Sequence, residues 1–101
     1  MRDPYDLREQ EAADERDSEQ RKLTLKQQEE DIKWLMQHPA GRRIATRLLE
    51  KTGVRQLSFN PSGSVMAFNE GRRNVGLWFE SELLTHSPEG YFKLLKEFAS
   101  E

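Results

Sequence analysis

The start of the chain is almost devoid of apolar side chains, and this limits which part of the sequence can form a core. After Met1, the apolar side chains as far as residue 21 are those of Tyr5, Leu7, Ala12 and Ala13. A segment of this composition cannot bury enough surface to offset the entropy that it loses on ordering. We therefore expect residues 1–22 to form a charged arm, disordered or helical on a partner, and residues 23–101 to form one small domain.

Charge is distributed unevenly along the chain, although the net charge is only -2. Residues 1–30 carry ten acidic and six basic side chains, and residues 33–73 carry eight basic and two acidic ones. Residues 74–101 carry two basic and five acidic side chains, so a basic middle lies between two acidic ends. This segregation favours either a polyanionic or acidic partner or contacts of the ends with the middle, and the sequence leaves both open.

The absence of cysteine excludes several kinds of site. Disulfides, zinc sites built on thiolates and cysteine nucleophiles all require this residue. No apolar run approaches the roughly 20 residues of a bilayer span, and the N-terminus lacks the basic-then-apolar layout of a signal peptide. We expect no membrane partner, and a location in a cell or in a particle assembled there.

Apolar spacing and proline and glycine positions predict a mainly α fold, a small bundle of three to four helices with an extended or helical N-terminal arm. A helix over residues 23–37 should end at the corner Gln37-His38-Pro39, because a residue before proline is pushed out of the helical region. A second helix is expected over residues 39–51, with Gly53 as its left-handed stop.

The second half of the chain predicts two more helices after an uncertain connection. Residues 55–68 contain the turn signal Asn60-Pro61-Ser62-Gly63 and predict either a short hairpin or an irregular loop. A third helix is expected over residues 70–85 and a last one over residues 88–98, with Ser87 as its cap and a proline in its first turn.

The triplet Gly-Arg-Arg occurs twice, at residues 41–43 and 71–73. A guanidinium group presents a planar fork of donors that suits carboxylates and phosphates. A positive side chain at a helix start is unfavourable, which indicates a compensating group. That group is either internal, with Glu50, Glu70, Glu80 and Glu82 as candidates, or on a partner. The candidate partner-binding residues are Arg42, Arg43, Arg47, Arg72 and Arg73.

Small and aromatic residues have candidate structural roles. Gly41, Gly71 and Gly76 are expected to permit close helix packing, since a glycine inside a helix costs about 1 kcal/mol against alanine. Trp34 and Trp78 lie at core spacing, so burial is favoured over stacking on nucleic-acid bases.

Patterns typical of catalysis or metal binding are lacking in the sequence. No nucleophile with a base, phosphate-binding glycine loop or pair of acids in apolar surroundings occurs, so an enzyme is not expected. His38 and His86 each precede a proline and have no neighbours at ligand spacing, so we expect neither a metal nor a cofactor. Helix-terminal histidines commonly bond backbone carbonyls instead.

A longer pattern resembles a small bacteriophage family. It runs from Asp31-Ile32-Lys33-Trp34-Leu35-Met36 through Gly41-Arg42-Arg43 and Thr52-Gly53-Val54 to Asn69-Glu70-Gly71-Arg72-Arg73-Asn74-Val75-Gly76. These motifs, within about residues 31–98, are similar to those of the Bbp19-like proteins. Members of that family are encoded among the virion structural genes of short-tailed phages, so the resemblance implies a role in the virion or its assembly.

These observations lead to two main functional hypotheses. The first is a non-enzymatic structural or accessory protein of a short-tailed phage particle, present in several copies against a symmetric component such as the portal or a neighbouring ring. Its expected location is the virion, and the host cytoplasm during assembly. The second is a nucleic-acid-associated factor that places its basic middle on phosphates, those of packaged DNA included. A small host-directed binding protein is a third reading.

Overall fold

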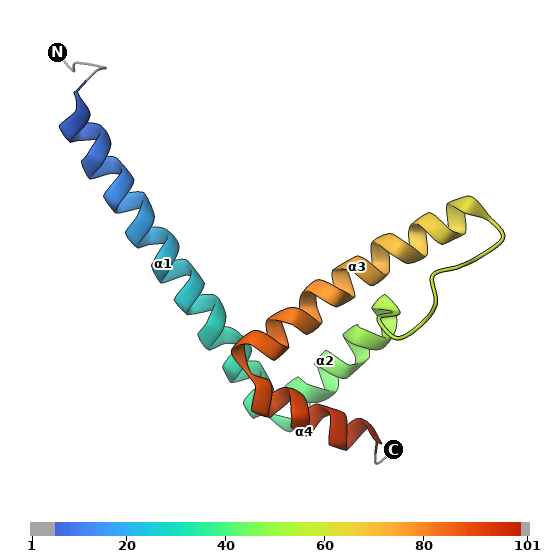
Figure 1. Ribbon diagram of the computed structural model, residues 1–101. Coiled ribbons are helices and arrows are strands. Elements are labelled where there is room, and N and C mark those ends of the chain that lie inside the picture. The colour runs from blue at the N-terminus through green and yellow to red at the C-terminus, as the bar shows by residue number, and fades with distance from the viewer. Residues whose placement is uncertain (1–5, 100–101) are drawn as a thin grey trace. The chain divides into compact units, whose positions relative to one another are not determined.

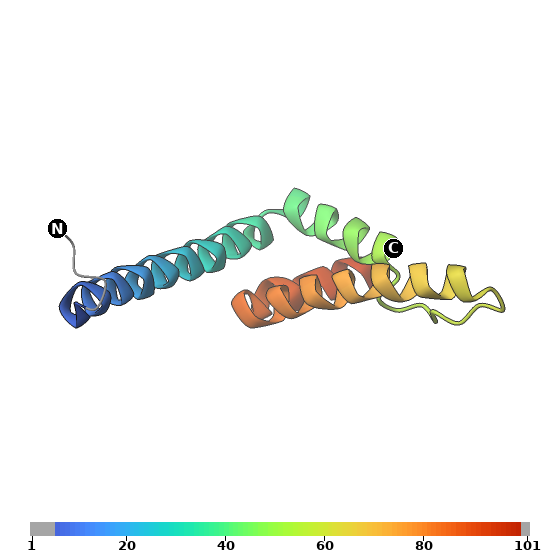
Figure 2. The ribbon, with the colours of Figure 1, turned by 90° about the horizontal axis from the view of Figure 1, so that it is seen from above.

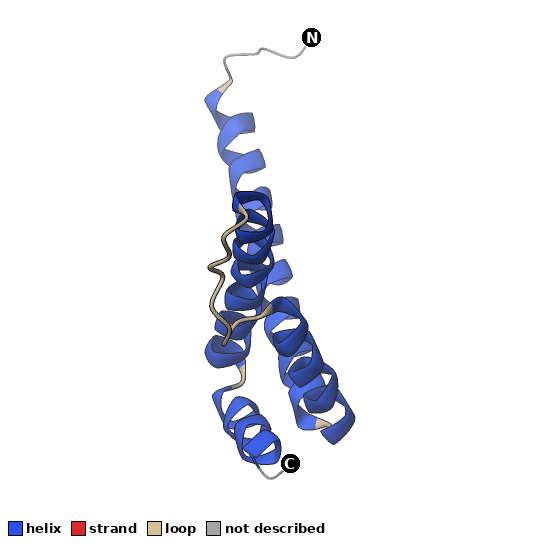
Figure 3. Ribbon diagram, turned by 90° about the vertical axis from the view of Figure 1, so that its right-hand side faces the viewer, coloured by secondary structure: helices blue, strands red, loops and turns tan. Residues whose placement is uncertain are grey.

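A computed structural model describes residues 6–99, which form four helices and no strand (Figure 3). The helices are α1 (Leu7–Gln37), α2 (Pro39–Thr52), α3 (Gly63–His86) and α4 (Pro88–Ala99), as labelled in Figure 1. The mainly α fold that the sequence predicts is thereby confirmed. The chain divides into two compact units, Met1–Glu30 and Asp31–Glu101, so the division falls later than the predicted end of the arm at residue 22.

Within the described part of the first unit, residues 7–30 are helical and make up the larger part of α1. Asp6 accepts a hydrogen bond from the backbone N–H of Arg8 at 3.0 Å and so caps this helix. Leu23 and Leu25, at the start of the helix predicted over residues 23–37, are 62% and 63% exposed. The helix starts at Leu7 rather than near residue 23, because the Glu, Gln and Arg residues of the arm are themselves good helix formers. Residues 1–5 of the predicted arm lie outside the described residues.

The corner between α1 and α2 lies where the sequence predicts it. His38 has an extended backbone, with φ -103° and ψ 133°, and Pro39 is the first residue of α2. The His38 Nδ1–H donates to the carbonyl oxygen of Trp34 at 2.7 Å, which satisfies one of the last carbonyls of α1. The Trp34 and His38 rings lie 5.0 Å apart on the surface of this corner.

The connection from α2 to α3 is an irregular loop over residues 53–62. Gly53 ends α2 with φ 70°, a left-handed conformation that favours glycine. A hairpin is wrong for this region, because α3 begins at Gly63 and already includes residues 63–69. Ser62 caps α3 by accepting from the N–H of Val65 at 3.5 Å, and Asn60 accepts from the N–H of Ser62 at 2.9 Å. The residues that signal a hairpin turn thus form a helix start.

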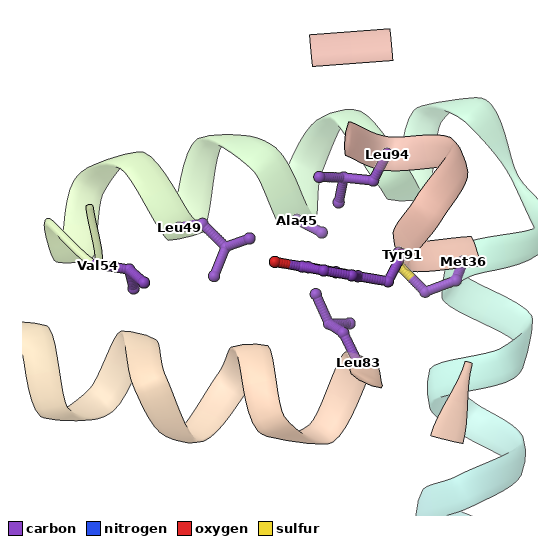
Figure 4. Close-up of a cluster of buried hydrophobic side chains, with 7 residues drawn as sticks. All are labelled: Met36, Ala45, Leu49, Val54, Leu83, Tyr91 and Leu94. Atoms are coloured by element: carbon purple, nitrogen blue, oxygen red, sulfur yellow. The ribbon is translucent and has the colours of Figure 1, made fainter. Parts of the chain in front are cut away.

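The last three helices pack against one another in pairs, as Figures 1 and 2 show. Their common core consists of seven buried side chains (Figure 4), namely Met36, Ala45, Leu49, Val54, Leu83, Tyr91 and Leu94. The ring of Tyr91 extends from α4 between the side chains of Leu83 and Leu94. All seven belong to the unit of residues 31–101.

Neither tryptophan belongs to this core, which corrects the structural role expected for them. Trp34 is 64% and Trp78 is 62% exposed. The apolar residues of α3 are distributed all around the helix, so most of them cannot face one core. Gly76 and Leu83 are the buried residues of α3, and Trp78 lies well away from the line that joins them.

Candidate interaction surfaces

Arg42 is an internal brace between the corner, α2 and α4. Its side chain is buried, and Nη1 donates to the carbonyl oxygen of Met36 at 2.9 Å. Nε lies 2.9 Å from Glu97 Oε1 and Nη2 lies 2.8 Å from the same oxygen. The positive charge near the start of α2 is therefore compensated from within the chain, by an acid other than the four that the sequence suggested.

The contact with Arg42 changes the pKa of Glu97. The hydrogen bonds from Arg42 hold the pKa of Glu97 below its usual value, and the nearby charges of Arg43 and Lys93 act in the same direction. Partial burial acts against this shift. The carboxylate therefore stays ionised at neutral pH and forms a bidentate pair with Arg42.

Arg43 and Arg47 lie on the exposed face of α2 and form a cationic row with Lys51. The three side chains are spaced four residues apart, which puts them on one face of a helix. None of them makes an ion pair with another described residue within 4.0 Å. The first two also line a groove of about 470 Å³, with Ala40, Ile44, Thr46, Glu50, Glu97 and Phe98. These arginines remain available to a partner.

Arg72 and Arg73, the second pair, lie in different surroundings. The Arg72 guanidinium lies 5.8 Å from the centre of the Phe68 ring, a cation–π distance. It also lies beside Gly53, where a Cβ would be 3.3 Å from Nη2, and its buried Nε has no hydrogen-bond partner in the described part of the chain. Arg72 therefore packs against the end of α2, whereas Arg73 lines an open groove on another side of α3.

That groove lies between α3 and the loop before it. Its volume is about 450 Å³, and it is lined by Gln56, Leu57, Ser58, Phe59, Gly63, Met66, Ala67, Glu70 and Arg73. Leu57 is 92% and Phe59 is 76% exposed. The Asn69 amide donates to the carbonyl oxygen of Ser58 at 3.3 Å and so ties the loop to the helix. Leu57 and Phe59 belong to the part of residues 55–68 where the sequence predicts a short hairpin or an irregular loop, and they lie in an irregular loop.

The three glycines with expected packing roles differ. A Cβ on Gly41 would collide with the carbonyl of Leu35, and one on Gly76 would collide with the side chains of Thr52 and Val54. Both glycines therefore lie at close approaches between parts of the chain. A Cβ on Gly71 would meet no atom of residues 6–99 within 4 Å.

Sequence reasoning missed a polar group at the edge of the core. The Tyr91 hydroxyl donates to Glu80 Oε2 at 2.9 Å and accepts from Arg55 Nη2 at 3.4 Å. Burial, and next the hydrogen bond to Glu80, raises the pKa of Tyr91, whereas Arg55 acts against this. The three residues come from α4, α3 and the loop, so no local spacing could have indicated the contact.

A small cleft is lined in part by Arg55, which bonds the Tyr91 hydroxyl. It has a volume of about 190 Å³ and is lined by Thr46, Leu49, Glu50, Gly53, Arg55, Gln56, Leu94 and Phe98. Pockets for drug-sized ligands typically measure about 300–1,000 Å³. Among residues 6–99 no three histidine or acidic side chains gather as metal ligands, and no described helix is long and apolar enough to cross a membrane.

The fold and its surfaces define a small helical protein whose exposed arginine and apolar side chains suit contacts with other macromolecules. The family model of Bbp19-like phage proteins matches residues 32–96, and the chain belongs to this family of bacteriophage proteins. The match spans the helical unit that contains the core and confirms the resemblance found in the sequence. No curated protein and no solved structure shows significant similarity to the chain.

Proposed function

We propose that the protein is a non-enzymatic component of the phage particle or of its assembly, which docks on a symmetric ring such as the portal or its neighbours. The observation that carries this proposal is the groove between α3 and the loop at residues 56–59, in a chain of a phage protein family. Large apolar side chains exposed to this extent on a small protein commonly mark a protein–protein contact.

The groove has the composition of a docking site for a protein. Leu57 and Phe59 supply exposed apolar anchors, and the flexible side chain of Met66 also lines the groove. Glu70 and Arg73 also line the groove and add one acidic and one basic side chain to its apolar residues, a mixture that is typical of protein–protein contacts. A ring of identical subunits would offer one such contact per subunit.

The proposal is tested on purified particles of the phage that encodes the chain. We expect mass spectrometry to detect the polypeptide in several copies per particle. A phage carrying Leu57→Ser with Phe59→Ser should yield particles that lack it, although the variant protein stays folded, since both side chains are exposed. Leu84→Ser, which removes another exposed leucine of α3, is the matched control and should leave the copy number unchanged. Particles without the polypeptide would refute docking on the finished virion.

A second candidate function, binding to DNA, is favoured by the cationic row of Arg43, Arg47 and Lys51. Phosphate contacts by such side chains make affinity fall with rising salt concentration, with a slope that follows the number of contacts. Arg43→Gln with Arg47→Gln should flatten that slope by roughly two contacts. The matched control, Lys22→Gln with Lys26→Gln on α1, should leave it unchanged. Absence of binding to duplex DNA at low salt would exclude this function.

A further inference from the structure

One exposed face of α3 carries no ionisable side chain over most of the helix, in a chain of which 34% is charged. The residues of this face are Ser64, Ala67, Phe68, Gly71, Asn74, Val75, Trp78 and Ser81, and all of them are exposed. The face lies roughly a third of a turn away from the buried line of Gly76 and Leu83. Solvated helix faces usually carry charges, so this composition calls for another explanation.

Four residues form an apolar stripe along the centre of this face, and we call Phe68, Gly71, Val75 and Trp78 the seam. Their spacing of three, four and three residues is that of the contact positions of paired helices. Phe68 is 67%, Val75 is 58% and Trp78 is 62% exposed. The seam therefore has the spacing of a helix-pairing surface, and the described residues leave it exposed.

No close contact among residues 6–99 explains the glycine at position 71. Glycine weakens a helix interior, and at Gly76 the close approach of Thr52 and Val54 accounts for its presence. At Gly71 a Cβ would meet none of the described residues within 4 Å. A glycine at the centre of an apolar seam permits the backbone or a large side chain of a second helix to come close.

We propose that the seam is the contact between two copies of this chain, with their α3 helices antiparallel about a twofold axis. The pattern is self-complementary in that direction, since Phe68 then faces Trp78 of the second copy and Gly71 faces Val75 of the second copy. Each large ring meets a large ring near the ends, and the small glycine receives the valine in the middle. A twofold contact uses one surface patch on both copies, as this arrangement does.

The area and charge of the face suit such a pair. Aromatic side chains bury about 150–250 Å² each, so four rings that are now about two-thirds exposed would bury roughly 400–650 Å². Specific contacts start at about 1,200 Å² in total, and the remaining residues of the face supply further area. The residues of the face are themselves uncharged, whereas Arg72 lies at its edge, with its guanidinium 5.8 Å from the centre of the Phe68 ring. We expect a dimer of roughly micromolar affinity, and this inference does not rest on the proposed function.

The first test is sedimentation velocity of the full chain over a range of concentrations. A monomer–dimer equilibrium is expected, and Gly71→Gln should weaken it by at least about tenfold, because glutamine adds a long polar side chain to the seam. Dilute Gly71→Gln protein should melt no lower than the unchanged chain, since glutamine favours helix, so its loss of pairing is not loss of folding.

The matched control for this test is Leu84→Gln, which removes an exposed leucine on another face of the same helix. Association should stay within about twofold of the unchanged chain. A monomer at millimolar concentration would overturn the proposal and leave the seam to another protein. The proposal would also be overturned if Gly71→Gln and Leu84→Gln weakened association equally, or if Gly71→Gln did not weaken it at all.

The second test establishes the direction of pairing and uses the absence of native cysteine. Gly71→Cys and Val75→Cys proteins are oxidised separately and as a mixture. Antiparallel pairing predicts that cross-linked dimers form mainly in the mixture, because residue 71 faces residue 75 of the second copy. Preferential linking of each variant with itself, or no linking in the mixture, would overturn the antiparallel arrangement.

Discussion

The Arg42 side chain connects three parts of the domain that lie far apart in sequence. Its hydrogen bond to the Met36 carbonyl is buried, so truncation leaves that oxygen without a partner. We expect Arg42→Ala to lower the free energy of unfolding by about 2 kcal/mol, as measured by urea denaturation. Arg43→Ala, at the exposed neighbouring position, should change it by less than about 0.5 kcal/mol. Equal effects of the two substitutions would show that Arg42 is no brace.

The other end of that contact makes stability depend on pH. Because the pKa of Glu97 is lower in the folded than in the unfolded chain, the unfolded chain takes up this proton first as the pH falls. The contribution of Glu97 is present above its ordinary pKa of 4.5 and is lost as the pH falls through the lower folded value. Glu97→Gln should therefore melt below the unchanged chain at pH 7, and the two melting curves should converge on acidification. A difference in melting temperature that stays constant on acidification would contradict the ion pair of Glu97 with Arg42.

Trp78 provides a test of how the aromatic residues are distributed. Burial of this side chain in the core would make Trp78→Ala cost roughly 3 to 5 kcal/mol. Since the indole is 62% exposed, we expect less than about 1 kcal/mol in dilute solution, where dimers are absent. Leu83→Ala, at a fully buried position of the same helix, should cost about 2–5 kcal/mol. Thermal denaturation of both variants decides which residue faces the core.

Two glycines of α3 should respond oppositely to the same change. Gly71→Ala adds a methyl group in open space, and its greater helix propensity should stabilise the dilute protein by about 0.5–1 kcal/mol. Gly76→Ala forces the same group against Thr52 and Val54, and overpacking should cost about 1–3 kcal/mol. Chemical denaturation measures the free energy of unfolding of both variants. If Gly76→Ala stabilised the protein, α2 and α3 would not approach closely at Gly76.

The helices that proline and glycine delimit could be predicted closely from the sequence, whereas the start of α3 could not. Pro39, Gly53 and Pro88 fix the backbone locally, so the expected bounds of α2 and α4 differ by one residue from the observed ones. At residues 60–63 one local pattern suits both a hairpin turn and a helix cap. The chain adopts the helix cap, in which Ser62 accepts from the N–H of Val65, and residues 63–68 are exposed, so no buried face signals the helix there.

Across the whole molecule, the sequence identified the arginines but could not assign their roles. Arg42 and Glu97 lie 55 residues apart, and only the fold brings them together. The two copies of the triplet therefore have different roles. In α2, Arg42 is an internal brace and Arg43 is exposed. In α3, Arg72 packs against Gly53 and Arg73 lines a groove. Residue type indicated the chemistry of these sites, and the packing of the helices determined which side chains remain available.

The distribution of the core predicts how the chain tolerates truncation. All seven core residues belong to the unit of residues 31–101, and Met36 is the buried residue of α1. Deletion of residues 1–22 should therefore leave the melting temperature of the remaining chain unchanged, although the helical circular-dichroism signal falls. Met36→Ala removes a side chain that is 1% exposed and should cost about 2–5 kcal/mol, enough to lower melting by roughly 10 °C or more. If the truncation lowered melting as much as Met36→Ala does, the arm would be part of the folded core.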